Sequence, residues 1–208
     1  PSVMLTGGYM SPGSYQGNML TLTHTKQAYA AYVEGSMSRE DYKQIVKHAC
    51  PNAGVCPFMG TANTMCAFAE VLGLSPDGNA SVRAQSPQWR QMAVEAARKI
   101  VELVKDEVRP LSRIGRASFE NAIRYVMATG GSTNSILHIP AVAAQAGISI
   151  TPDMFDEISR KTPLISAIYP NHPSYTMADF SAAGGLSTVI RELAKAGAWD
   201  TSTAGMFD

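Results

Sequence analysis

The sequence contains little charge for its length. Charged residues make up 16% of the 208 residues, against about 25% in a typical soluble domain. The 17 basic and 17 acidic side chains cancel to a formal net charge of zero, so no overall field would attract nucleic acid or an anionic membrane. We therefore expect a small-molecule or protein partner, and we expect another domain or subunit to cover part of the surface.

Cysteine is also scarce. Cys50, Cys56 and Cys66 form an odd set and nothing resembles a secretory leader, so we expect a reducing compartment and no structural disulfides. No apolar run approaches the ~20 residues that a membrane-spanning helix needs. We expect a cytoplasmic protein, or one of an organelle matrix if the source is eukaryotic. The chain opens with Pro1 and a short apolar run, which predicts that the natural chain begins upstream.

Several well-known catalytic patterns are missing from the sequence. It has no paired carboxylates, no Ser/His/Asp set with a nucleophile turn, and no glycine loop with a Walker lysine. Asp41, Glu70 and Asp179 all have ordinary helical roles open to them. Local chemistry alone therefore does not define a reaction.

Apolar patterning predicts alternating helices and strands. Short apolar runs at residues 3–6 and 164–168 are typical of buried strands. Helices are predicted over residues 25–34, 60–72, 87–109, 118–129, 132–146 and 177–196, the last interrupted at Gly184-Gly185, and further helices are predicted to begin at Ser38 and at Thr151-Pro152. This alternation, with 45% hydrophobic residues, favours an α/β fold in a single domain.

Capping residues indicate where several of these helices begin and end. Ser38, with Asp41 three residues later, predicts a capping box, and Ser86-Pro87 predicts the start of a long helix. Gly73 is suited to a helix C-terminus, and Gly130-Gly131 should break the helical pattern.

Cys56 is the first candidate for chemistry. Two prolines and a glycine make residues 50–57 a shaped loop, and a helix is predicted to begin near Gly60. The positive end of that helix would favour the thiolate, which is the form that binds iron. A buried, inert cysteine remains the alternative for Cys56, and Cys66 is expected to be a core residue.

His48, Cys50 and Cys56 suggest zinc as another alternative. Their spacing lacks the paired Cys-x-x-Cys or His-x-x-x-His elements of specific zinc sites. His48 and Cys50 are therefore expected to finish the preceding helix, where a histidine is electrostatically favourable.

A second candidate is the run Gly130, Gly131, Ser132, Thr133 and Asn134. Backbone N–H groups and hydroxyls at a helix start can bind a carboxylate or a phosphate. Ordinary helix starts often share this pattern, so the run alone does not define a site. His138, one turn further on, is expected to be a satisfied core histidine.

Four segments together resemble a known family. Residues 48–56, His-Ala-Cys-Pro-Asn-Ala-Gly-Val-Cys, followed by residues 59–65, Met-Gly-Thr-Ala-Asn-Thr-Met, are similar to the cluster-binding segment of the dihydroxy-acid dehydratase and phosphogluconate dehydratase family. Residues 128–134 with Leu137-His138 resemble a second family segment. Residues 1–10 are similar to the strand that follows the family's Cys-Asp-Lys motif, and residues 177–180 with Gly184-Gly185 resemble a later segment.

The resemblance implies cofactors and a partial active site. Three cysteines hold an iron-sulfur cluster in this family, and Cys56 matches the third. The other two ligands, and the Cys-Asp-Lys lysine and neighbouring acid that help to bind Mg²⁺, would lie outside the chain, since Cys50 and Cys66 match no ligand position. Gly130 to Asn134 would line the active site. No catalytic residue of the family falls in this chain.

The resemblance also implies the fold and the extent of the whole protein. The family's N-terminal, cluster-binding domain has a three-layer α/β/α fold with a mostly parallel central sheet, and residues 1–208 would form part of it. A carboxy-terminal β-barrel domain would supply a carboxylate and a serine base. We therefore expect this fragment to be inactive and the full-length protein to form a homodimer.

Two features of the sequence favour different substrate classes. The family's hydro-lyases convert a small 2,3-dihydroxy acid to a 2-oxo acid. Residues 49–56 favour branched-chain dihydroxy acids and hence amino-acid biosynthesis, whereas Phe58-Met59-Gly60 favours a sugar acid such as an aldonate or phosphogluconate. A non-catalytic metal-binding or interaction module is the alternative from another class, based on Cys50, Cys56 and the low charge, and a plain structural scaffold is a third.

Overall fold

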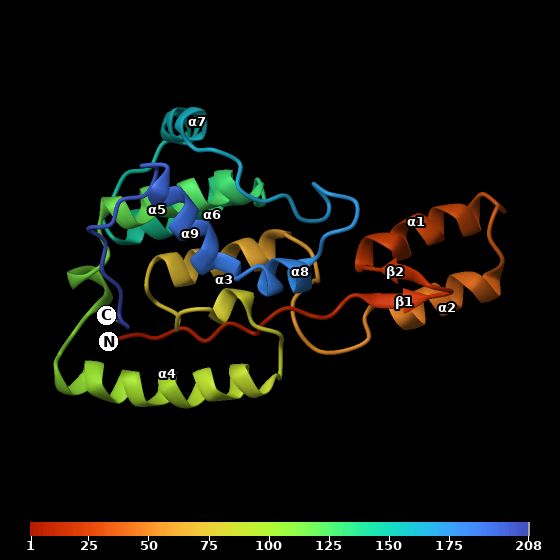
Figure 1. Cartoon of the computed structure of the whole chain (residues 1–208), viewed down its shortest axis with the longest axis horizontal. Coiled ribbons are helices and arrows are strands. Elements are labelled where there is room, and N and C mark those ends of the chain that lie inside the picture. The colour runs from red at the N-terminus through yellow and green to blue at the C-terminus, as the bar shows by residue number, and fades with distance from the viewer. Residues whose placement is uncertain (208) are drawn as a thin grey trace.

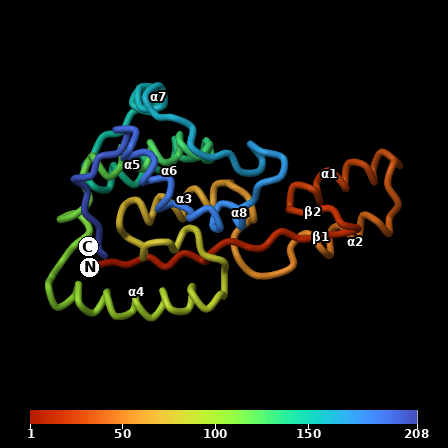
Figure 2. The backbone as a smooth tube through the Cα atoms, in the orientation of Figure 1, coloured from red at the N-terminus to blue at the C-terminus, as the bar shows by residue number. Residues whose placement is uncertain are grey.

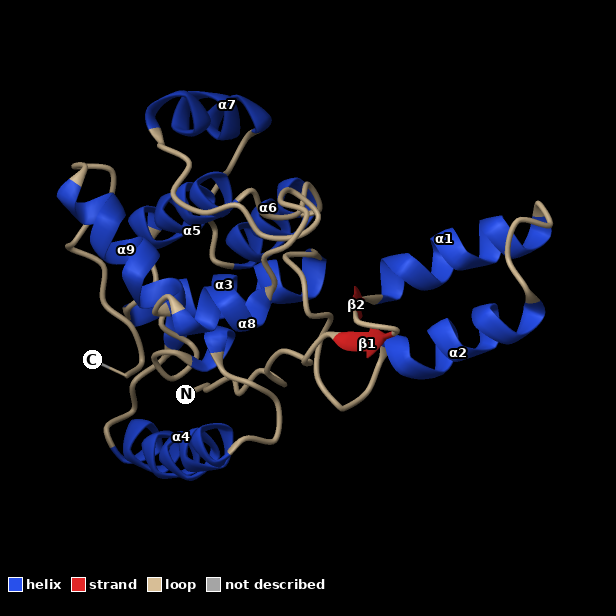
Figure 3. Ribbon diagram, turned by 45° about the vertical axis from the view of Figure 1, so that its right-hand side comes forward, coloured by secondary structure: helices blue, strands red, loops and turns tan. Residues whose placement is uncertain are grey.

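The protein consists of a helical body and a projecting arm, both seen in a computed structural model that describes residues 1–207 (Figure 1). The arm lies away from the body in two views turned by 45° (Figures 1 and 3). The two ends of the chain lie side by side at the opposite end of the body (Figure 2).

The arm is built from a small hairpin and two antiparallel helices. Strands β1 (Gly13–Tyr15) and β2 (Asn18–Leu20) pair antiparallel. Helices α1 (Leu22–Val33) and α2 (Arg39–Ala49) follow. The predicted cap at Ser38 is confirmed, because its hydroxyl accepts the Asp41 N–H at 3.0 Å.

The body is almost entirely helical. It contains α3 (Thr61–Val71), α4 (Pro87–Lys105), α5 (Arg116–Thr129), α6 (Ser135–Gln145), α7 (Pro152–Lys161), α8 (Met177–Ala182) and α9 (Gly185–Lys195), with short 3-10 turns η1 (Asn79–Ser81) and η2 (Pro110–Ser112). The predicted starts at Ser86-Pro87 and breaks at Gly73 and Gly130 are confirmed. No helix within residues 1–207 is long and apolar enough to cross a membrane.

The core lies between α3, α5 and α9. Phe68 of α3 and Phe119 of α5 bring their rings to 6.2 Å, and Ile123 is fully buried beside them. Leu193 of α9 is also fully buried in this cluster. The start of α3, which follows the Cys56 loop, is therefore held by a well-packed helix.

The predicted parallel sheet is not present in the described residues. Residues 3–6 and 164–168 are not strands, and the one sheet there is the antiparallel hairpin of the arm. The backbone of residues 3–6 bonds instead to a helix end and a side chain, as in the Thr6 N–H to Asn79 Oδ1 bond at 2.7 Å. Tyr9 alone forms parallel bridges, one to Val55 and one to Arg83. The observed fold is thus helices with very little sheet.

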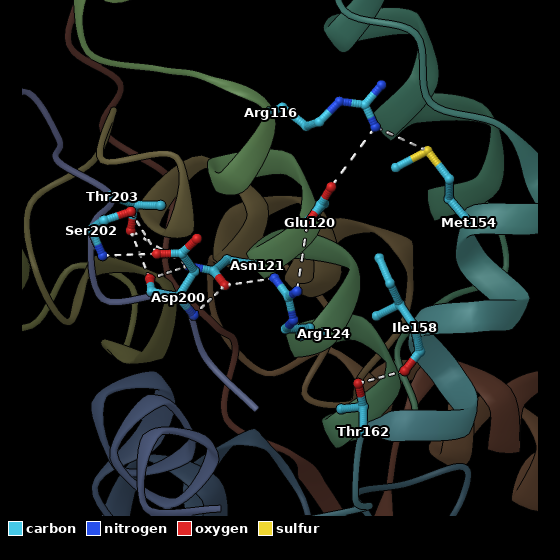
Figure 4. A network of polar contacts seen from close by, with 10 residues as sticks. All are labelled: Arg116, Glu120, Asn121, Arg124, Met154, Ile158, Thr162, Asp200, Ser202 and Thr203. Carbon is cyan, nitrogen blue, oxygen red and sulfur yellow. Dashed lines mark hydrogen bonds and ion pairs between the residues drawn. The ribbon is translucent and has the colours of Figure 1, made fainter. Parts of the chain in front are cut away.

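A polar network fastens the segment after α9 to the core. Asn121, which is fully buried on α5, donates to the Asp200 carbonyl oxygen at 2.8 Å and accepts the Asp200 N–H at 3.0 Å. Arg124 donates to Asn121 Oδ1 and pairs with Glu120 (Figure 4). The side-chain amide of Asn121 therefore pairs with both the N–H and the carbonyl oxygen of Asp200, in the segment that follows α9.

Glu70 has a structural role that its sequence context does not reveal. Its buried carboxylate accepts the N–H groups of Gly78 and Ala80, both at 2.7 Å, and so fixes the turn at η1. Burial raises the pKa of this carboxyl to about 7, and these two N–H bonds only partly offset the effect. The sequence predicts an ordinary helical role for Glu70, whereas the structure shows a buried carboxylate that holds the turn at η1.

Glu70 should make stability depend on pH. Its pKa rises from 4.5 to about 7 on folding, so the folded state binds the proton more tightly, and the resulting stability is complete below about pH 4.5. It is lost as pH rises through 7, by on the order of 3 kcal/mol in total. Urea unfolding of the wild type and Glu70→Gln from pH 4.5 to 8 measures this. The stability of the wild type should fall relative to that of Glu70→Gln as pH rises, because only the wild type ionises, and parallel curves would contradict the assignment.

Candidate functional site

Cys56 lies in the loop between α2 and α3, and one side chain of α3 shapes that loop. Asn63 is 1% exposed, and its Nδ2 donates to the carbonyl oxygens of Cys56 at 2.6 Å and Phe58 at 2.7 Å. Asn63 Oδ1 is buried and has no hydrogen-bond partner in the described part of the chain. Asn63 therefore fixes the backbone on which the Cys56 thiol stands.

The loop before α8 holds the other side of the Cys56 loop. The Met59 N–H donates to the Tyr169 carbonyl oxygen at 3.0 Å, and the Met177 N–H donates to that of Pro57 at 2.9 Å. Phe58 meets the Tyr169 ring edge-on at 6.0 Å. The thiol is thus carried by a loop that is bonded on both sides.

The glycine pair at the end of α5 allows neighbouring segments of the chain to approach closely. Gly130 adopts a φ of 58°, in the left-handed region that favours glycine. Asn171 donates to the Gly130 carbonyl oxygen at 2.6 Å. At Gly131 a Cβ atom would lie 3.2 Å from Thr64 Oγ1 and from Val126 Cγ1, so a side chain there would push α3 away.

Hydroxyl groups join the segment that follows the Cys56 loop to the Gly130 to Asn134 run. Thr64 Oγ1 accepts the Ser132 N–H at 3.0 Å and donates to the Gly60 carbonyl oxygen at 2.9 Å. Thr61 Oγ1 lies 2.9 Å from Ser132 Oγ and accepts from Asn134 Nδ2 at 2.9 Å. The structure therefore brings the start of α3 and the start of α6 together.

Most of the expected anion cradle is occupied by these internal bonds. The N–H groups of Gly131, Ser132 and Asn134 donate to Val126 O, Thr64 Oγ1 and Ser132 Oγ. Thr133 is exposed, and within residues 1–207 its N–H and hydroxyl have no hydrogen-bond partner. The run is thus chiefly a joint between helices, and Thr133 is its member free to contact a ligand.

Three predictions about nearby residues have different outcomes. His138 is exposed on α6, so the expected core histidine is wrong; its helix turns that face outward. His48 Nδ1 donates to the Gln44 carbonyl oxygen within the last turn of α2, and Cys50 ends that helix, as expected. Cys66 is partly buried against the core, also as expected.

The Cys56 thiol does not gain the expected acidity from the helix. Burial raises its pKa above the ordinary value, and Cys50 raises it further, outweighing a lowering backbone hydrogen bond. The start of α3 at Thr61 is five residues further along the chain, whereas the helix dipole acts only near the first turn. The thiolate therefore needs a bound cation, because metal binding displaces the thiol proton.

Cys56 fits a metal centre as one ligand of a larger set. It is a free, half-buried cysteine in a fixed loop. In the described residues no three His, Cys, Asp or Glu side chains gather closely enough to hold a metal ion. A cluster at this position would need further ligands from outside residues 1–207.

Sequence reasoning missed the residues that hold the site together. Asn63 and Thr64 lie inside the run 59–65, yet nothing local shows that they reach Cys56 and Ser132. Asn171 gave no signal at all. Its bond to Gly130 spans 41 positions.

Comparison with known proteins shows that these segments all lie within one family match. Residues 1–206 match the family described as dihydroxy-acid/6-phosphogluconate dehydratase N-terminal. Dihydroxy-acid dehydratases of Roseiflexus sp. (strain RS-1) and Natronomonas pharaonis are 39% and 41% identical to the chain, covering 95% and 97% of it and 35% and 34% of those proteins. The dihydroxy-acid dehydratase of Thermodesulfovibrio yellowstonii is 41% identical over 93% of the chain and 35% of its own length. The chain spans about a third of these relatives.

Replacing Thr64 with Val should separate the two helix starts. The change leaves the Ser132 N–H without its acceptor in a buried setting, which costs about 1–3 kcal/mol. Urea unfolding should show this loss. Thr64→Ser keeps the hydroxyl and should recover much of it, and Thr133→Val at the exposed neighbour should change stability by less than about 0.5 kcal/mol. Equal losses of stability for Thr64→Val and Thr133→Val would count against the Thr64–Ser132 bond as the link between the two helix starts.

Proposed function

The chain belongs to the dihydroxy-acid/6-phosphogluconate dehydratase family, and on that premise we propose that the full-length protein is an iron-sulfur hydro-lyase. It converts a 2,3-dihydroxy acid to a 2-oxo acid. The observation that carries the proposal is the joining of the Cys56 loop to the Gly130 to Asn134 run through Thr61 and Thr64. This joint holds the Cys56 loop and the exposed start of α6 together, as a shared metal and substrate site would require.

Cys56 would contribute one thiolate to the iron-sulfur cluster. When bound, the cluster and Mg²⁺ would supply Lewis acidity toward the substrate's 3-hydroxyl and carboxylate. Asn63 orients the thiol through the Cys56 carbonyl oxygen, and the Tyr169 and Pro57 backbone bonds keep the loop in place. The other cluster ligands and those of Mg²⁺ would come from residues outside this chain.

Thr133 would bind the substrate. Its free N–H and hydroxyl stand at the exposed start of α6, where the positive helix end favours a carboxylate. In the overall reaction the C2 proton leaves to a base, the C3–O bond breaks and water departs, and the resulting enol becomes the 2-oxo acid. This chain contributes no candidate for that base, so we propose that the fragment alone is inactive.

The remainder of the protein would cover the apolar surfaces of this part. Helix α6 carries no charged side chain, and Leu137 is 69% exposed on it. We propose that the missing part, including a carboxy-terminal β-barrel domain, and a second subunit in a homodimer bury such faces. The missing part would also complete the three-layer α/β/α domain, with the Tyr9 bridges as part of its parallel sheet.

A 2,3-dihydroxy acid is the proposed substrate, because the relatives compared are named dihydroxy-acid dehydratases, and the run at residues 49–56 favours a branched-chain one. A sugar acid is the alternative, supported by the sequence Phe58-Met59-Gly60 after the Cys56 loop. Assaying the full-length protein with both acids separates the two proposals.

Replacing Cys56 with Ser should remove the cluster from the full-length protein. After anaerobic reconstitution the wild type should be brown and should dehydrate 2,3-dihydroxy acids, whereas Cys56→Ser should lose iron, visible absorbance and activity, since its hydroxyl is a poor iron ligand. Cys50→Ser, at the exposed helix end, is the matched control and should keep all three. A colourless, inactive wild type that binds stoichiometric zinc through Cys50 would support the non-catalytic metal module instead.

Replacing Thr133 with Val should weaken catalysis without weakening the fold. Loss of one hydrogen bond to an anionic group should lower kcat/KM of the full-length protein by about tenfold or more. Thr133→Ser keeps the hydroxyl and should restore most of the activity. Steady-state kinetics measures both effects, and an unchanged kcat/KM in Thr133→Val would remove Thr133 from the substrate site.

A further inference from the structure

A separate pocket of about 370 Å³ lies between the loop before α8 and α8 itself. Its walls are largely apolar and include Ile165, Ile168, Phe180 and Ala183. This volume is near the lower end of the range for small-molecule sites, which are typically apolar with a few polar groups. None of the candidate site residues, Cys56 or Gly130 to Asn134, lines it.

One polar atom of the pocket is left without a partner. Ser166 Oγ is buried and forms no hydrogen bond within the described residues. The backbone of Ser166 is satisfied by the Ala128 carbonyl oxygen at 3.0 Å, so the hydroxyl is not needed for the loop. A buried hydroxyl without a partner costs free energy, and because this atom is closed off from solvent, it is not itself a contact for a ligand.

His172 lines the pocket and has one ring nitrogen left for a ligand. Its Nδ1 accepts the N–H groups of Ser174 at 3.2 Å and Tyr175 at 3.4 Å. The accepting Nδ1 carries no proton, so the ring proton is on Nε2. The ring also stacks on Tyr175 with centroids 4.3 Å apart, which fixes the direction of this donor.

Asp179 also lines the pocket and carries a negative charge. Its Oδ2 accepts both the N–H and the hydroxyl of Thr176 at 2.8 Å, so the side chain is held at the start of α8. These bonds lower the pKa of the carboxyl and keep it ionised. Oδ1 has no hydrogen-bond partner in residues 1–207, so this oxygen can accept from a ligand.

We infer that this pocket binds a small aliphatic α-amino acid. The aliphatic side chain would pack on Ile165, Ile168 and Phe180, with the ammonium group at Asp179 and the carboxylate at the Nε2–H of His172. A simple carboxylic acid would lack a partner for Asp179 and would be repelled by its charge. The inference stands independently of the proposed dehydratase reaction, whose anionic hydroxy acid carries no ammonium group.

Calorimetric titration of the full-length protein with L-leucine tests the inference. Leucine should bind with a Kd of about 1 mM or tighter. 4-Methylpentanoate, which lacks the ammonium group, and glycine, which lacks the aliphatic chain, should each bind at least about tenfold more weakly. Equal binding of 4-methylpentanoate would overturn the assignment of Asp179, and no heat with any aliphatic amino acid at about 10 mM would overturn the site.

Matched variants locate the binding. Ala183 is exposed and lines the pocket, whereas its neighbour Ala182 is exposed and does not. Ala183→Leu should fill the pocket and abolish leucine binding, and Ala182→Leu should leave it unchanged. Leucine binding that survives Ala183→Leu would place the ligand elsewhere and overturn the proposal.

Discussion

The hydroxyl of Thr64 couples the two halves of the candidate site. It links the start of α3 to Ser132, and the absence of a side chain at Gly131 allows the contact. Because α3 is packed against α5 through Phe68 and Phe119, this junction fixes the loop that carries Cys56. The thiol and the exposed Thr133 are therefore held by the packed core instead of by flexible loops.

Burial determines the ionisation of two groups in this body. It raises the pKa of the Cys56 thiol, although a helix begins nearby, and it raises that of Glu70 to about 7 despite two N–H bonds. In both cases the cost of removing charge from water exceeds the local stabilisation. Cys56 thus favours the neutral thiol in the protein as described, whereas Glu70 serves as an anchor whose effect on stability changes with pH.

Exposed apolar residues accompany the low content of charged residues in this chain. Leu137 on α6, Val101 on α4 and Val33 on the arm are all exposed. Single exposed apolar residues are common, but α6 contains no charge on any face, and helices of that kind are normally buried all round. Such a surface is consistent with a chain that spans about a third of its relatives.

Local physics allowed the sequence to specify most helices and their ends. Ser38, Ser86 and Gly130 act within a turn of their own positions, so their caps could be predicted. The run that contains Cys56, with the other segments in family order, also indicates the family from sequence alone.

Contacts between distant residues required the tertiary structure. Residues 3–6 have the composition of a strand, but a strand forms only where a partner strand pairs with it, and Asn79 bonds to this segment instead. The same limit applies to the bond between Thr64 and Ser132, to the exposure of His138 and to the pocket at Ser166. Periodicity and capping describe neighbours along the chain, whereas these features depend on which segments meet in space.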